Sequence, residues 1–319
     1  MPDFITLPDL ALRSMGGSVV AASDESFAEK ESLIRPGRPG FQTETFGSKG
    51  QVYDGWETRR RRSPGHDWAV VRLGVPGVIR GVVVDTAWFK GNYPPHASVE
   101  AAAVEGHPAP DELAAAEWTE IVPRSELKGD AEHRFAVTAP GRFTHVRLNI
   151  FPDGGVARLR VHGEARPDLS MWDGLGLDLA ALANGGLVTA CSDEFYSAPN
   201  NVIAPGLARH QAEGWETARR RDGGNDWLVI RLAGRGVIRL AEIDTTNLLF
   251  NAPGAVALTG LDGDREVELL PRTRLQPDTP HRFRLGHHDP VTHVRVDIYP
   301  DGGLARVRLH GHLAAAGSW

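Results

Sequence analysis

One segment rich in tryptophan, arginine and acidic residues occurs twice in the chain, and we call it the Trp box. GWETRRRRSPGHDW occupies positions 55–68, and GWETARRRDGGNDW occupies positions 214–227. Arginine binds carboxylates through its planar guanidinium group, and a carboxyl or imidazole group beside it can transfer a proton. The box therefore either holds a small anion or forms an internal network of salt bridges, and the residues alone leave both interpretations open.

A second polar segment directly follows a valine-rich stretch. DTAWFKGNYPPH occupies positions 85–96, and its counterpart DTTNLLFNAPGA begins at Asp244. Loops at the end of a β-sandwich commonly hold binding residues. The second copy has leucine in place of Lys90, asparagine in place of His66 and an apolar residue in place of His96. If the chain has one chemical site, we therefore expect it in the first copy; whether the second copy carries a site of its own is left open.

The repeat extends well beyond these two segments. DLALRSMGGSVVAASDESF from Asp9 aligns with DLAALANGGLVTACSDEFY from Asp178. THVRLNIFPDGGVARLRVHG at 144–163 aligns with THVRVDIYPDGGLARVRLHG at 292–311. An internal duplication of this extent predicts two domains, which we place at 5–165 and 174–313. The second copy is shorter on both sides of the box, and we expect both losses to lie in surface loops.

Each copy shows the alternation that is typical of β-strands. Apolar and polar residues alternate in HVRLNI at 145–150 and again in ARLRVH at 157–162, on either side of FPDGG. This pattern predicts a hairpin with one face on a core and one polar face. The stretch 68–89 predicts two more strands, with a turn at 74–77 between them. Short strands punctuated by glycine and proline predict an all-β fold, with one antiparallel sandwich or jelly roll in each copy.

Composition limits the partners of the protein. A chain of 319 residues that is 41% hydrophobic can bury two cores. A net charge of -6 argues against nucleic acid or an anionic membrane as a partner. The single cysteine, Cys191, excludes an internal disulfide framework. We find no secretory signal and no membrane-spanning run, so we expect a cytoplasmic protein. Assembly into a homo-oligomer is left open.

The sequence predicts no metal-ligating residues and identifies no cofactor. The histidines at 287, 288, 310 and 312 lack carboxylates at ligand spacing, and CxxC is absent. Phosphate-loop, GxSxG and GxGxxG patterns are also absent. Dependence on a divalent metal is left open.

The motifs and their order resemble those of the allantoicase family. VVAASDESF, GWETRRRR, DTAWFKGNYPP and PDGGVARLRVHG follow one another as they do in that family, in both copies and over nearly the full length. The resemblance implies two tandem jelly-roll domains of galactose-binding type. It also implies an amidinohydrolase that converts allantoate to ureidoglycolate and urea in allantoin and purine degradation.

The first copy offers each group that this reaction needs. The substrate carboxylate needs a cation, the leaving urea needs a proton, and the attacking water needs a base. The ureido groups need hydrogen-bonding partners. The candidate catalytic residues are Glu57, His66, Asp67 and Asp85. The candidate substrate-binding residues are Arg60, Lys90, Asn92, His96, Trp56 and Thr86.

Two other functions stay open at this stage. A non-catalytic tandem ligand module of galactose-binding type would present exposed aromatic side chains and carry a secretion signal. A related ureide amidohydrolase acting on ureidoglycolate would use the same kinds of residue as an allantoicase. A panel of ureide substrates separates these alternatives.

Overall fold

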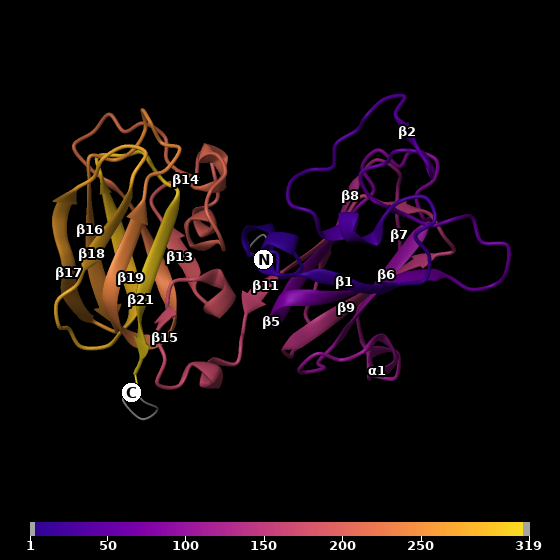
Figure 1. Cartoon of the computed structure of the whole chain (residues 1–319), viewed down its shortest axis with the longest axis horizontal. Coiled ribbons are helices and arrows are strands. Elements are labelled where there is room, and N and C mark those ends of the chain that lie inside the picture. The colour runs from indigo at the N-terminus through magenta and orange to yellow at the C-terminus, as the bar shows by residue number, and fades with distance from the viewer. Residues whose placement is uncertain (1–3, 315–319) are drawn as a thin grey trace. The chain divides into compact units, whose positions relative to one another are not determined.

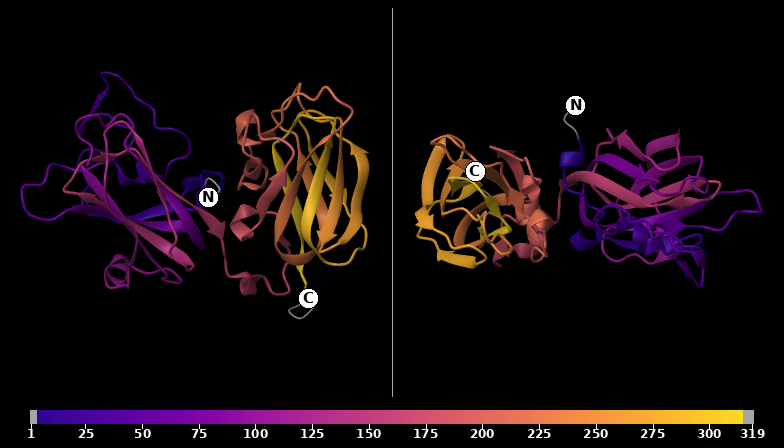
Figure 2. Two further views of the ribbon diagram at one scale, coloured as in Figure 1. Left: turned by 180° about the vertical axis from the view of Figure 1, so that it is seen from behind. Right: turned by 90° about the horizontal axis from the view of Figure 1, so that it is seen from above.

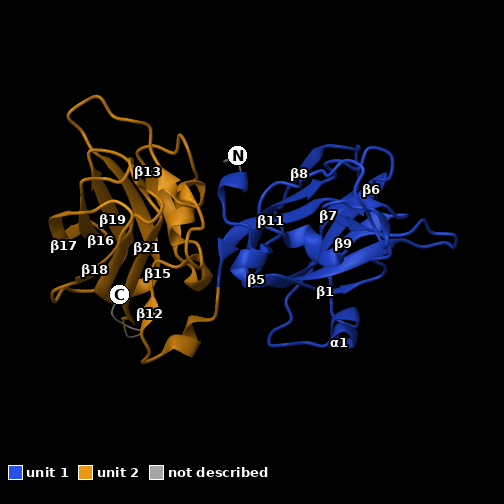
Figure 3. Ribbon diagram, turned by 45° about the horizontal axis from the view of Figure 1, so that its top comes forward, with its two compact units in different colours: residues 1–166 blue, residues 167–319 orange. Residues whose placement is uncertain are grey.

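The protein is built from two strand-rich units. The computed structural model describes residues 4–314. The units comprise Met1–Arg166 and Pro167–Trp319, and Figure 3 shows them in different colours. The only α-helix in the described residues is α1 (Pro110–Ala114), so the expected all-β class is confirmed (Figure 1). No described helix is long and apolar enough to cross a membrane.

One long strand, β5 (Asp67–Asp85), organises the first unit. The first half of β5 lies in a sheet with the order β1-β5-β9-β6-β7, and its second half pairs with β11 and β8. The bounds of these strands are β1 (Ser18–Ala22), β6 (His96–Ala102), β7 (Thr119–Glu126), β8 (Glu132–Ala136), β9 (Phe143–Phe151) and β11 (Arg158–Ala165). The short pieces are β2 (Phe46–Gly47), β3 (Gly50–Gln51), β4 (Trp56–Glu57), β10 (Gly155–Val156), and the 3-10 turns Phe4–Thr6, Arg13–Met15 and Lys30–Ile34. Because β5 contributes to both layers, it ties the two sheets of the unit together.

The stretch 74–77 is a bend inside β5, so the predicted turn between two strands is wrong. The register of β5 against β9 shifts between Arg72 and Gly77. A side chain at Gly74 would begin 2.3 Å from the carbonyl oxygen of Met15, and one at Gly77 would begin 2.3 Å from that of Glu164. The two glycines therefore let neighbouring backbone approach the bend closely.

The predicted hairpin around FPDGG is also wrong. β9 pairs with residues 67–77 of β5, whereas β11 pairs with residues 77–85. The segment between β9 and β11 therefore crosses from one layer of the sandwich to the other. The supposedly solvated polar face of β9 is largely covered, because His145 is 1% exposed and Asn149 is 5% exposed.

Both ends of β5 lie at the same end of the first unit. The backbone N–H of Asp67 donates to the carbonyl of Pro152 at 3.1 Å, and the N–H of Ala157 donates to the carbonyl of Asp85 at 2.7 Å. The N–H of Gly155 donates to the carbonyl of Asn92 at 2.7 Å. Main-chain hydrogen bonds thus bring together the Trp box, the loop after β5 and the PDGG segment at 152–155. We call this region the loop end of the first unit.

The second unit repeats this arrangement. β15 (Asp226–Asp244) pairs through its first half with β13 and β19 and through its second half with β21 and β18. The strands of this unit are β12 (Leu177–Asp178), β13 (Leu187–Cys191), β14 (Trp215–Glu216), β16 (Ala255–Asp262), β17 (Arg265–Arg274), β18 (Pro280–Arg284), β19 (Val291–Tyr299), β20 (Gly303–Leu304) and β21 (Arg306–Leu313). Its 3-10 turns are Leu169–Trp172, Leu182–Asn184, Pro199–Ile203 and Gln211–Glu213. Figure 2 shows the strand layers of each unit from two further sides.

His145 is a buried titratable group in the first unit. Its Nδ1 lies 2.8 Å from the Thr144 hydroxyl, and its Nε2 is buried without a hydrogen-bond partner among the described residues. Burial, followed by the nearby charge of Arg72, lowers the pKa of His145 to about 4. In the unfolded chain the imidazole has its ordinary pKa of about 6.5. Below that pH the unfolded chain binds a proton that the folded chain does not, so acid destabilises the fold.

We expect the His145→Asn variant to lose less stability on acidification than the wild type does. Since the folded pKa lies below the unfolded pKa, the wild-type loss builds up as the pH falls from about 6.5 to about 4. The substitution should remove about 1–3 kcal/mol of this loss. Urea unfolding near neutral pH and at about pH 4.5 measures it. His293→Asn in the second unit is the matched control, with a smaller effect expected because His293 is only half-buried. Equal acid sensitivity in the wild type and His145→Asn would contradict this prediction.

Candidate functional site

Glu57 is a shielded carboxyl group at the loop end. It lies in β4, which pairs with β10, and its side chain is 9% exposed. Asn92 Nδ2 donates to Glu57 Oε1 at 2.6 Å, so the structure joins the Trp box to the loop after β5. In residues 4–314, Glu57 Oε2 has no hydrogen-bond partner. Burial raises the pKa of Glu57, and the hydrogen bond from Asn92 offsets only part of that rise. A carboxyl group whose pKa is raised keeps its proton to a higher pH than an exposed one, which suits it to proton transfer.

A cavity of about 320 Å³ opens beside the same box. We call it the arginine cavity. The residues that line it are Ser23, Asp24, Arg59, Arg60, Arg61, Arg62, Ser63 and Asp67. Four arginines face two carboxylates, which leaves a net charge of +2. The arginine cavity is therefore suited to a small anion.

Two of the four arginines are neutralised within the chain. Arg59 Nε lies 3.3 Å from Asp24 Oδ2, and Arg61 Nη1 lies 2.7 Å from Asp67 Oδ1. Burial alone would raise the pKa of Asp24, but hydrogen bonds from the backbone N–H groups of Arg59 and Ser26 more than offset it and lower the pKa. Within the described part of the chain, neither Arg60 nor Arg62 has an ion-pair partner. These two guanidinium groups are available to a ligand.

Asp67 is placed to position Arg61. Its side chain is 1% exposed and also accepts a hydrogen bond from the Ser23 hydroxyl at 3.0 Å. Asp67 Oδ2 and Arg61 Nε are both buried and have no hydrogen-bond partner within residues 4–314. The Arg61 backbone N–H donates to Asp153 Oδ2 at 2.8 Å, which anchors the box to the PDGG segment. These contacts give the wall of the arginine cavity a fixed geometry.

Asp85 and Thr86 hold the loop that follows β5. Asp85 Oδ1 accepts a hydrogen bond from the Ala87 N–H at 2.8 Å. The Thr86 hydroxyl donates to the Lys128 carbonyl at 2.6 Å, and its side chain is fully buried. Burial raises the pKa of Asp85. Both residues shape the loop that carries Asn92.

Three other predicted binding residues lie apart from the arginine cavity. Trp56 is fully buried, and its Nε1 donates to the Asp24 carbonyl at 2.7 Å, so it belongs to the core. The Lys90 side chain is 73% exposed and lies 3.8 Å from Asp130 Oδ2. His96 begins β6, where its backbone pairs with Phe151.

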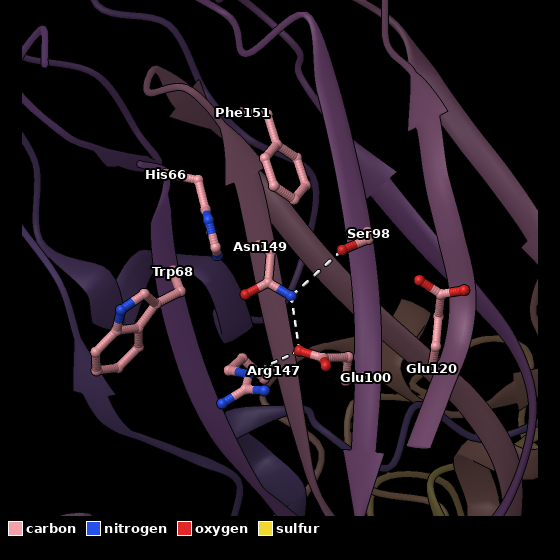
Figure 4. A pocket seen from close by; sticks show the side chains of 8 residues that line it. All are labelled: His66, Trp68, Ser98, Glu100, Glu120, Arg147, Asn149 and Phe151. Atoms are coloured by element: carbon pink, nitrogen blue, oxygen red, sulfur yellow. Dashed lines mark hydrogen bonds and ion pairs between the residues drawn. The ribbon is translucent and has the colours of Figure 1, made fainter. Parts of the chain in front are cut away.

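His66 lines a different pocket, which we call the outer-face groove (Figure 4). Successive side chains of a strand point to opposite faces, so Trp68 points away from the side of β5 that carries Asp67. The groove has a volume of about 440 Å³. Its lining residues are His66, Trp68, Ser98, Glu100, Glu120, Arg147, Asn149 and Phe151. The His66 ring lies 4.7 Å from the Phe151 ring, centre to centre.

Our site prediction omitted most of the outer-face groove. Arg147 Nε donates to Glu100 Oε2 at 2.7 Å, and Asn149 Nδ2 donates to the same oxygen at 2.8 Å and to the Ser98 hydroxyl at 3.3 Å. The alternating polar residues in 145–150 are the available signal, but such a polar face is typical of a solvated surface or a domain contact as well as of a binding site. The partner strand β6 supplies Ser98 and Glu100, and no local pattern connects the two strands.

The second unit has the same backbone arrangement at its loop end but different polar side chains. Arg59 and Ser63 correspond to Ala218 and Asp222. Arg220 forms ion pairs with both Asp222 and Asp226. Counted together with Arg219, Arg221 and Asp193, the formal charges sum to zero. Asn251 donates a hydrogen bond to Glu216 Oε1, and Gln211 donates one to Glu216 Oε2. Both carboxylate oxygens of Glu216 therefore already have a partner. These differences favour a single site, in the first unit.

No cluster of three or more potential metal ligands is present among the described histidine, cysteine, aspartate and glutamate side chains.

Comparison with known proteins matches both halves of the chain to the same family of repeats. A family model described as the allantoicase repeat matches residues 8–166 and again residues 177–314. The chain is 60% identical to a "probable allantoicase" of Nocardia farcinica, covering 97% of this chain and 95% of the relative. It is 51% identical to one of Streptomyces avermitilis, covering 99% and 88%. The crystal structure of allantoicase from Saccharomyces cerevisiae superposes with a TM-score of 0.80 at 34% identity, covering 96% and 93% of the two chains.

Proposed function

Since the chain belongs to the allantoicase family, we propose that it hydrolyses allantoate to ureidoglycolate and urea at the loop end of its first unit. One observation carries the choice of site: the segment that lines a cavity with a net charge of +2 begins two residues after Glu57, a carboxyl group whose pKa is raised by burial. The substrate is an anion, and its cleavage needs a proton donor.

Arg60 and Arg62 are proposed to bind the substrate carboxylate. Their guanidinium groups present paired N–H donors in the geometry of a carboxylate. Glu57 and Arg60 are three residues apart, so their Cα atoms lie within about 11 Å of each other. We propose that allantoate spans this separation and contacts both side chains.

Glu57 is proposed to transfer the proton. The central carbon of allantoate bears two ureido groups, and the bond from this carbon to one ureido nitrogen breaks. Urea leaves with the bonding electrons and takes a proton from Glu57. Water adds to the carbon, becomes the hydroxyl of ureidoglycolate and returns a proton to the carboxylate. Asn92 holds Oε1 and leaves Oε2 for this exchange.

We expect Arg60→Ala to raise the KM for allantoate about 10-fold or more, because a charged hydrogen bond to the substrate is lost. Arg62 remains and limits the effect. Steady-state urea release measures it. Arg219→Ala, the corresponding change in the second unit, is the matched control and should leave KM unchanged. A KM that rises equally in both variants, or in neither, would remove Arg60 from the binding site.

A substrate panel tests the activity itself. The purified protein is given allantoate, allantoin or ureidoglycolate, with and without a chelator, and urea is measured. We expect rapid release from allantoate alone. Release from ureidoglycolate alone would instead identify a different ureide amidohydrolase. A folded protein that releases no urea from any of the three, with or without the chelator, would overturn the proposed function.

A further inference from the structure

We infer that the outer-face groove of the first unit is a second binding site, which takes a planar cationic group of the guanidinium type. This inference does not rest on the proposed catalytic site. It rests on a comparison of equivalent positions in the corresponding sheets of the two units.

In the second unit, a guanidinium group of the chain itself occupies the equivalent place. Arg295 Cζ lies 4.7 Å from the centre of the Trp227 ring. The same guanidinium reaches Asp297 through Nε at 3.1 Å and through Nη2 at 3.0 Å. A cation is thus held between an aromatic ring and a carboxylate, an arrangement that stabilises it.

The strand registers establish the equivalence. Trp227 pairs with Asp297 just as Trp68 pairs with Asn149. Two residues earlier on the same strands, Arg295 corresponds to Arg147. Arg295 faces Thr259 across the ladder, whereas Arg147 faces Glu100.

In the first unit this arginine is held elsewhere. Arg147 Cζ lies 4.5 Å over the ring of Trp118, and its Nε donates to Glu100. Trp118 lies between β6 and β7, whereas β16 and β17 are joined by a tight turn. Among residues 4–314, no guanidinium lies over the Trp68 ring. The first unit thus keeps the aromatic wall and has moved the cation off it.

The open groove retains groups that would hold such a cation. Among the lining residues, the two carboxylates of Glu100 and Glu120 outweigh the one guanidinium of Arg147, and Arg124, which is not a lining residue, lies over the Phe151 ring. Asn149 is 5% exposed, and its Oδ1 has no hydrogen-bond partner in the described part of the chain. Figure 4 shows this oxygen on the side of Asn149 that faces His66 and Trp68. An anion such as allantoate is disfavoured here, which separates the groove from the arginine cavity.

Methylguanidinium is the probe for this site. Its binding to the full chain is followed by NMR through the indole N–H signals, with the signals of Trp68 and Trp227 assigned from the Trp68→Phe and Trp227→Phe variants. Methylurea, which is planar but uncharged, and methylammonium, which is charged but not planar, are the control ligands.

We expect methylguanidinium to shift the Trp68 signal saturably and to leave the Trp227 signal in place, because Arg295 already covers that ring. Glu120→Gln, a change at an exposed side chain, should weaken binding about 3-fold. In Trp68→Leu, which lacks the Trp68 signal, binding is followed by isothermal titration calorimetry and should weaken about 10-fold or more relative to the wild type. Both variants should keep their allantoate turnover.

Four results would overturn the inference. The Trp68 signal could stay unmoved, or it could move as strongly with methylurea or methylammonium. Binding could persist undiminished in Trp68→Leu. Allantoate turnover could fall in folded Glu120→Gln as far as it falls in Glu57→Gln, which would make the groove part of the catalytic site.

Discussion

Replacing Glu57 by glutamine is expected to lower kcat for allantoate about 100-fold or more and to change KM little. Glutamine keeps the shape of the side chain and its contact with Asn92, but it cannot donate and recover a proton. The substrate carboxylate is bound by other groups, so binding should survive. Steady-state urea release from allantoate, measured over a range of substrate concentrations, separates kcat from KM.

The second unit supplies the control for this experiment. Glu216 occupies the position of Glu57, pairs with Asn251 in the same way and has its other oxygen bound by Gln211. Glu216→Gln should therefore leave kcat near the wild-type value. If Glu57→Gln kept its turnover, or if the two variants lost it equally while folded, Glu57 would not be the proton-transfer group.

Replacing Trp56 by alanine is expected to reduce the free energy of unfolding of the first unit by about 3–5 kcal/mol. The indole is fully buried and donates its N–H to the Asp24 carbonyl, so the substitution leaves both a cavity and an unpaired carbonyl. Urea unfolding measures the loss. A small change in stability together with a large rise in KM would contradict this and return Trp56 to the substrate-binding residues.

Trp215→Ala is the matched variant in the second unit. Trp215 is also fully buried, and its Nε1 donates to the Asp193 carbonyl at 2.8 Å. We expect a similar loss of stability there, with allantoate turnover retained at temperatures where the variant is folded.

The sequence supported the all-β class and the repeat because both depend on local patterns. Alternation with period two identifies strands and their buried faces, and identity between distant segments identifies a duplication. Neither pattern says which strand pairs with which. The hairpin at FPDGG and the turn at 74–77 were predicted wrongly for that reason: a glycine-rich connection can equally reverse a strand, bend it or carry it to the other layer.

Only part of the candidate site can be predicted from the sequence. The Trp box placed Glu57, Arg60 and Asp67 near one another because they are close in the chain. The sequence of the box does not show which arginines are neutralised, because the partner of Arg59 is Asp24, which lies in a different segment of the chain. Arg147 and Asn149 were missed for a similar reason: their shared partner Glu100 lies 47 and 49 residues away.

The main-chain hydrogen bonds of the loop end also bear on how the duplicated units diverged. The second unit retains their equivalents: the N–H of Asp226 donates to Pro300 at 3.1 Å, that of Gly303 to Asn251 at 2.9 Å, and that of Ala305 to Asp244 at 2.7 Å. Backbone groups hold this architecture, so selection could exchange catalytic side chains in one copy without disturbing the scaffold. The two units thus share one backbone framework at the loop end and carry different side chains on it.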